Sequence, residues 1–123
     1  MVVGCSRAID PSRLAFAPVQ HLSQAGLYTD IATKTVAPVN HAFRPSFELW
    51  SDGAVKMRWI ALPDGAVIDT TNQDRWVFPV GTRAFKEFKF LGRRVETRLL
   101  EKVRDGHGGH AWSVSTFLWR DDE

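Results

Sequence analysis

Apolar and polar side chains alternate with a period of two in three stretches of the last third of the chain. These stretches cover residues 82–90, 94–103 and 111–119 and are rich in Phe, Val, Thr, Leu and Trp, which are residue types that favour strands. Short segments with turn residues, 91–93 and 105–110, separate them. We expect an antiparallel meander of three strands, because connections this short join neighbouring strands in hairpins.

The middle stretch of this meander assigns its side chains to two faces, because successive side chains of a strand point to opposite sides. Val95, Thr97 and Leu99 are predicted to share one face and to contribute to the core. Glu96, Arg98 and Leu100 are predicted to share the other. One face would then be apolar and the other charged, which is typical of an antiparallel sheet with one side in water.

Further upstream the pattern predicts shorter elements. Residues 55–62 alternate apolar and basic positions. The apolar positions, which are predicted to face the core, are Val55, Met57 and Trp59. The basic positions, which are predicted to face away, are Lys56 and Arg58. Residues 47–50 and 66–69 are short candidate strands, and 22–28 predict one or two helical turns that end at Gly26. The spacing of these elements favours an all-β fold, an antiparallel sandwich or an open barrel.

Length and charge narrow the class of protein. With 123 residues and 44% hydrophobic content, the chain suits a single domain. We expect a tether over residues 1–20 and one β domain over 21–123, whose fold continues beyond the end of this sequence. The net charge is only +2, and the arginines at 93–98 are interleaved with glutamates. A nucleic-acid partner is therefore not expected, because it requires basic residues gathered on one face. No apolar run reaches the roughly 18 residues of a membrane-spanning helix.

The single cysteine, Cys5, follows Val-Val-Gly near the N-terminus. These four residues resemble a bacterial lipobox, a signal in which the cysteine becomes the lipidated N-terminus of the mature protein. The resemblance implies export, a periplasmic or outer-membrane location, and contact with the membrane only through the lipid anchor. The alternative is a chance match. With one thiol, the sequence excludes an intrachain disulfide and a site built from several thiolates.

Residues 22–119 resemble a family of exported bacterial proteins of unassigned activity, in which a c-type haem segment often follows this domain. The motifs that carry the resemblance are LSQAGLY (22–28), LWSDGA (49–54), KMRWIALPDG (56–65), WVFPVGT (76–82), KEF (86–88) and RRVETRLL (93–100). The resemblance implies an envelope domain whose partner is a c-type haem module or another envelope protein.

A weaker similarity links the chain to small c-type cytochromes whose haem is crosslinked to a lysine. It is carried by residues 78–82, 86–87 and 117–119. Haem attachment of this kind requires a Cys-x-x-Cys-His segment, which this sequence lacks. Neither haem catalysis nor a crosslinking role for Lys86 is therefore carried over, and only a shared fold is implied.

His107 and His110 are the strongest candidate metal ligands. Two imidazoles three residues apart can bind zinc or copper, but such sites use three or four protein ligands. Asp105 is the only carboxylate close by in the sequence. The favoured interpretation is a glycine-rich hairpin loop with incidental histidines. We therefore expect no cofactor within this chain, with copper, zinc or haem as the alternatives.

Two groups of polar residues are candidates for ligand binding. In the Trp50–Gly53 segment, Asp52 and Gly53 are typical of a turn. The alternative is that Trp50 and Asp52 border a cleft, with Lys56 or Arg58 as the charge partner of the carboxylate.

The second group lies on the predicted meander and consists of Lys86, Glu87, Glu96 and Arg98. Such residues most often form ion pairs across a wet sheet face. The alternative is acid–base chemistry or the binding of an anion by paired carboxylates and an arginine.

No nucleophile elbow or phosphate loop is present in the sequence. The leading hypothesis is therefore a non-catalytic accessory or interaction domain of a cell-envelope lipoprotein, serving a haem or redox module. The first alternative is a metal- or haem-dependent oxidoreductase. The second is a carbohydrate-binding module, because five Trp could supply flat stacking surfaces.

Overall fold

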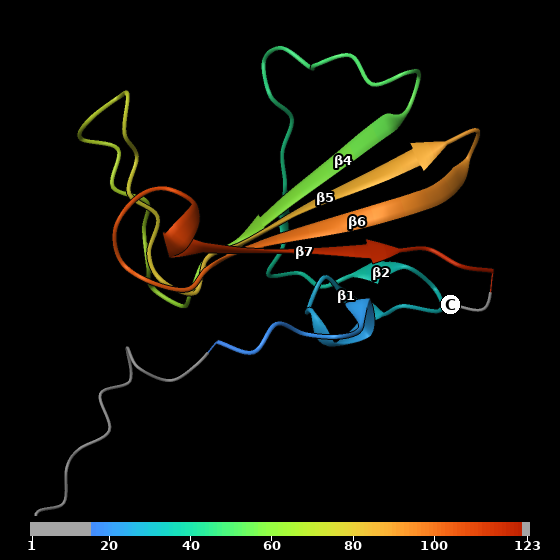
Figure 1. The fold of residues 1–123 in the computed structure, drawn as a ribbon, viewed down its shortest axis with the longest axis horizontal. Coiled ribbons are helices and arrows are strands. Elements are labelled where there is room, and N and C mark those ends of the chain that lie inside the picture. The colour runs from blue at the N-terminus through green and yellow to red at the C-terminus, as the bar shows by residue number, and fades with distance from the viewer. Residues whose placement is uncertain (1–15, 122–123) are drawn as a thin grey trace, which may run out of the picture.

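The structure, a computed structural model, describes residues 16–121; Cys5 and most of the expected tether lie outside this range. Its main element is an antiparallel sheet of five strands in the order β3-β4-β5-β6-β7 (Figure 1). The strands span His41–Ala42, Val55–Ala61, Arg83–Phe90, Arg93–Lys102 and Trp112–Leu118, in that order. Strands β5 to β7 form the predicted meander, and the all-β class is confirmed. None of the helices in residues 16–121 is long and apolar enough to cross a bilayer.

The N-terminal part of the described chain forms a smaller second layer. A 3₁₀ turn, Leu22–Gln24, leads into a two-stranded hairpin of β1, Tyr28–Asp30, and β2, Thr35–Val36. The predicted helical turn is thus confirmed, and Gly26 follows it with a φ of +82°. Nη1 of Arg83 lies close to Gly26 and donates a hydrogen bond to the Ala25 carbonyl. A glycine is favoured here by the positive φ, and a side chain would also displace the Arg83 guanidinium.

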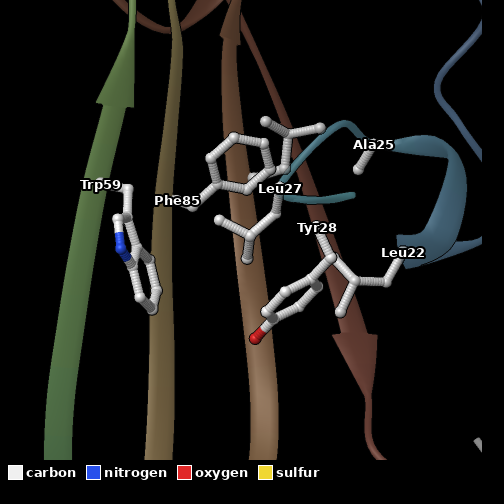
Figure 2. Packing of buried hydrophobic residues seen from close by; sticks show 7 residues of the cluster. Leu22, Ala25, Leu27, Tyr28, Trp59 and Phe85 are labelled. Carbon is white, nitrogen blue, oxygen red and sulfur yellow. The ribbon is translucent and has the colours of Figure 1, made fainter. Parts of the chain in front are cut away.

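The core forms where the small layer covers one face of the large sheet. Trp59, Phe85 and Leu99 are direct neighbours across β4, β5 and β6. Residues of the N-terminal layer pack on them: Leu22, Ala25, Leu27 and Tyr28 (Figure 2). The apolar face predicted from alternation is therefore the face that is covered. Its burial supplies the main drive to fold, at roughly 1.5–3 kcal/mol for each large apolar side chain.

A β-bulge makes one face assignment wrong. The register pairs Phe88 with Glu96 but Lys89 with Arg94, so Val95 is an extra residue on β6. Val95 is 46% exposed and lies on the uncovered side of the sheet, with Phe88 and Glu96. Thr97 and Leu99, by contrast, are buried on the covered face as predicted. A period-two pattern cannot reveal a bulge, because the bulge depends on the partner strand.

Other differences arise where candidate strands lack a neighbour. Residues 47–50 form no strand. Residues 66–69 contribute only a single bridge, between Asp69 and Val77. On β4, Trp59 is buried as predicted, but Val55 and Met57 remain largely exposed. The small second layer does not cover that end of the strand. Lys56, which was predicted to face away from the core, is instead buried on the opposite face.

Candidate functional site

The uncovered face of the large sheet carries its side chains in rows that cross the strands. Since Trp59, Phe85 and Leu99 point into the core, the residues next to them in sequence point the other way. Arg58 on β4, Lys86 on β5 and Arg98 on β6 are direct cross-strand partners. We call these three residues the cation row. They are three of the candidates expected from the sequence, and the sheet brings them together.

Apolar residues lie on both sides of the cation row. One neighbouring row is formed by Ile60, Ala84, Leu100 and Val114. The row on the other side is formed by Lys56, Phe88, Glu96 and Leu118. Val114 and Leu118 are each more than 60% exposed. The cation row is therefore bordered by accessible apolar surface at the β7 side, whereas at the β4 side Lys56 is buried and the Arg58 side chain is only 12% exposed.

The charges of the cation row are only partly neutralised. Arg58 pairs with Glu48 at 3.3 Å, and Nε of Arg98 pairs with Glu96 at 2.6 Å. Lys86 forms no ion pair with any residue of 16–121, and its Nζ lies 4.9 Å from the centre of the Phe88 ring. Partial burial lowers the pKa of Lys86, and the positive charges of Arg58, Lys56 and Arg98 lower it further. Like charges directly opposite one another destabilise a sheet, so the row favours an anion.

The predicted cleft at Asp52 is present, although its charge partner differs from the expectation. Ser51, Asp52 and Ala54 border a shallow groove of about 270 Å³ whose other side includes Glu96 and Arg98. Arg58 pairs with Glu48 rather than with Asp52, and Nζ of Lys56 donates to the Leu49 carbonyl. Asp52 and Gly53 both have positive φ, in agreement with a turn. Trp50 is 83% exposed and does not line this groove.

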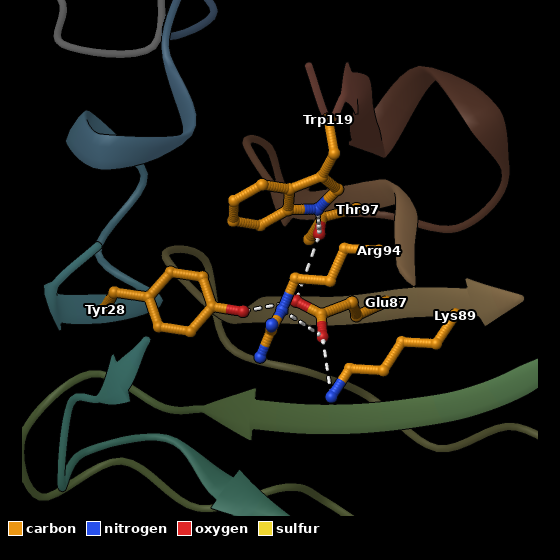
Figure 3. Close-up of polar contacts among 6 residues, drawn as sticks. All are labelled: Tyr28, Glu87, Lys89, Arg94, Thr97 and Trp119. Carbon is orange, nitrogen blue, oxygen red and sulfur yellow. Dashed lines mark hydrogen bonds and ion pairs between the residues drawn. The ribbon is translucent and has the colours of Figure 1, made fainter. Parts of the chain in front are cut away.

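Glu87 lies on the opposite face from the cation row, so the grouping of Glu87 with Glu96 and Arg98 is wrong. Because Glu96 pairs with Phe88, Glu87 has the other parity and points under the N-terminal layer. It is 1% exposed and accepts hydrogen bonds from the Tyr28 hydroxyl and from Nε of Arg94 at 3.0 Å (Figure 3).

Further contacts complete the surroundings of this buried carboxylate. The Thr97 hydroxyl lies 3.4 Å from Glu87, and Nζ of Lys89 lies 3.9 Å from it. The indole N–H of Trp119 donates to the Thr97 hydroxyl at 2.9 Å. Two cations and two hydroxyls thus offset the cost of burying one carboxylate. The arrangement connects the N-terminal layer to β5, β6 and the residue after β7, which is a structural role.

Sequence reasoning did not find Tyr28, Arg94 or Trp119 as partners of Glu87. Tyr28 is 59 residues away from Glu87, and no local pattern links them. Burial raises the pKa of the Tyr28 hydroxyl, and the hydrogen bond to Glu87 and the negative charge of Glu87 raise it further. The one available signal was that Glu87 lies two residues after Phe85 on β5 and so shares its face of the sheet.

The titration of Tyr28 tests this cluster, because Tyr28 is the only tyrosine in the chain. Its folded pKa exceeds the ordinary value of 10.0, so the stability it contributes is complete below pH 10.0 and is lost as the pH rises through the folded pKa. We expect no phenolate absorbance near pH 10.0 while the protein stays folded. Phenolate should appear at higher pH, together with the loss of near-ultraviolet circular dichroism. A normal phenolate titration in the folded state would contradict the cluster.

His107 and His110 lie in the exposed loop between β6 and β7, where Gly109–Ala111 form a short 3₁₀ turn. No group of three or more His, Cys, Asp or Glu side chains within residues 16–121 is placed to hold a metal ion. The loop therefore offers two imidazoles without a third protein ligand in the described part of the chain.

The site of greatest interest is thus the uncovered face, where five of the sequence candidates lie together: Asp52, Arg58, Lys86, Glu96 and Arg98. Comparison with known proteins finds no matching family model, no similar curated protein and no similar solved structure. The family resemblance of residues 22–119 therefore stays a prediction.

Proposed function

We propose that this chain is a non-catalytic interaction domain that binds an acidic segment of a partner protein on the uncovered face of its sheet. The observation that carries the proposal is the cation row, in which Lys86 lies between two arginines and has no carboxylate partner in residues 16–121. An arrangement that lowers stability locally and is only partly compensated, here by Glu48 and Glu96, is typical of a functional site.

The surroundings of the cation row favour a polypeptide over a small ion. The row crosses three strands and spans about 10 Å, since neighbouring strands lie about 4.8 Å apart. Exposed Val114 and Leu118 flank it, and a small anion would leave them in water. A segment with both acidic and apolar side chains would neutralise the row and cover these residues, as in protein interfaces that combine apolar contacts with arginine.

The kind of partner is consistent with the accessory role expected from the sequence. In the cell envelope implied by the lipobox-like Cys5, a c-type haem module or another envelope protein with an acidic surface would serve as the partner. The oxidoreductase and carbohydrate-binding alternatives stay predictions from the sequence.

A charge reversal at Lys86 tests the proposal. The probe is an extended peptide in which glutamates alternate with valines, titrated into labelled protein and followed by NMR chemical shifts. We expect the largest shifts at Lys86, Thr116 and Leu118. Lys86→Glu should weaken binding by at least about tenfold, because it places a carboxylate opposite the acidic side chains.

Two controls make the result decisive. Lys34→Gln removes a cation from the other side of the molecule and should leave peptide binding unchanged. Lys86→Gln should weaken binding while keeping the free energy of unfolding at or slightly above that of the parent protein, since it removes repulsion from Arg58 and Arg98. The proposal is wrong if adding the peptide shifts the resonances of residues outside the cation row and its neighbours. It is also wrong if the Lys86 and Lys34 variants lose equal affinity for the peptide.

A further inference from the structure

A second groove, which shares Phe90 and Val95 with the groove beside Asp52, lies between the turn after β1, the turn joining β5 to β6, and the end of β7. It is open to solvent, with a volume of about 580 Å³. The cationic side chains that line it are Lys34, Arg93, Arg94 and Arg120. Within residues 16–121, the one carboxylate among its lining residues is Asp121, which pairs with Arg93 at 2.6 Å. We call this the cationic groove, because its lining keeps an excess of positive charge.

Trp119 holds two of these cations in place. Nζ of Lys34 lies 4.4 Å from the centre of the indole ring, and the guanidinium carbon of Arg94 lies 5.6 Å from it. The ring itself is fixed by the hydrogen bond from its N–H to the Thr97 hydroxyl. Arg94 is further oriented by the buried carboxylate of Glu87 (Figure 3). The groove is therefore preorganised, which lowers the entropic cost of binding an anion.

We propose that the cationic groove binds a phosphate-bearing ligand, in addition to the partner segment proposed for the uncovered face. Arg94 uses Nε for Glu87, so the terminal nitrogens of its planar guanidinium can bind oxygens of an oxyanion. Lys34 and Arg120 would supply further positive charge to a ligand that carries more than one negative charge. The volume exceeds that of a single phosphate group, so a diphosphate or a phosphate ester fits better than an isolated ion.

The experiment uses two probes, because the same phosphate chemistry could come from a soluble compound or from a lipid headgroup. Inorganic pyrophosphate is titrated in one arm, and phosphatidylglycerol vesicles in the other, with phosphatidylcholine vesicles as reference. The indole N–H resonance of Trp119 reports binding in the groove. We expect saturable binding in at least one arm. Lys34→Gln and Arg120→Gln should each weaken it about tenfold, the size expected for one charge-assisted contact.

Arg75→Gln serves as the matched control, because Arg75 is exposed and lines neither groove, so its loss removes one positive charge and should leave affinity for both probes unchanged. Arg94 is kept in every variant, because its loss would leave Glu87 without its closest cation. The proposal fails if neither probe gives saturable binding. It also fails if Arg75→Gln weakens binding as much as Lys34→Gln does, since the effect would then be one of overall charge.

Discussion

Replacing Glu87 with alanine is expected to lower the free energy of unfolding by about 3–5 kcal/mol, the range for breaking a buried charged cluster by removing one partner. The variant leaves Arg94 without its carboxylate and the Tyr28 hydroxyl without its acceptor, beneath the N-terminal layer. Urea unfolding followed by circular dichroism measures the change. A loss of this size is a large part of the 5–15 kcal/mol that stabilises a typical domain.

Glu96 provides the matched control for Glu87. It lies on the neighbouring strand, on the opposite face, and pairs with Arg98, whose side chain is largely solvent-exposed, while Glu96 itself is partly exposed. Glu96→Ala should therefore cost less than about 1 kcal/mol, as is usual for surface ion pairs. Equal losses in the two variants would contradict the assignment of Glu87 to the buried face.

Replacing Phe85 with alanine is expected to cost about 3–5 kcal/mol, the usual range for removing a buried aromatic ring. Phe85 is 1% exposed and lies at the centre of the core between Trp59 and Leu99. The cavity would be lined by residues from both layers, so the hairpin should also lose protection from hydrogen exchange.

Phe47→Ala is the matched control, because it removes the same side chain from an exposed position. It is 92% exposed, and Phe47→Ala should change the free energy of unfolding by no more than about 0.5 kcal/mol. Thermal and urea denaturation of both variants make the comparison. If Phe47→Ala proved as destabilising as Phe85→Ala, the core would have to be placed elsewhere.

Much of the candidate site could be predicted because successive residues of a strand point to opposite faces of the sheet. Arg58 has the opposite parity to Trp59, and Arg98 the opposite parity to Leu99, so the sequence alone placed both on the charged side. The alternation within one strand does not show which residues of different strands lie opposite one another. The register puts Lys86 between these two arginines and thereby creates the repulsion on which the proposed function depends.

The sequence by itself determined the strands of the meander, the helical turn ending at Gly26 and the burial of Trp59, Thr97 and Leu99. Each depends on side-chain alternation or on the backbone freedom of one residue, which are local properties. Only the tertiary structure decided which surface is covered and which stays open.

The bulge at Val95 and the burial of Glu87 explain why the sequence did not determine which surface is covered. Both depend on a partner distant in sequence: the paired strand β5 for Val95, and Tyr28 in the N-terminal layer for Glu87. Burial and strand register are properties of contacts between segments, and the hydrophobic pattern of one segment does not contain them.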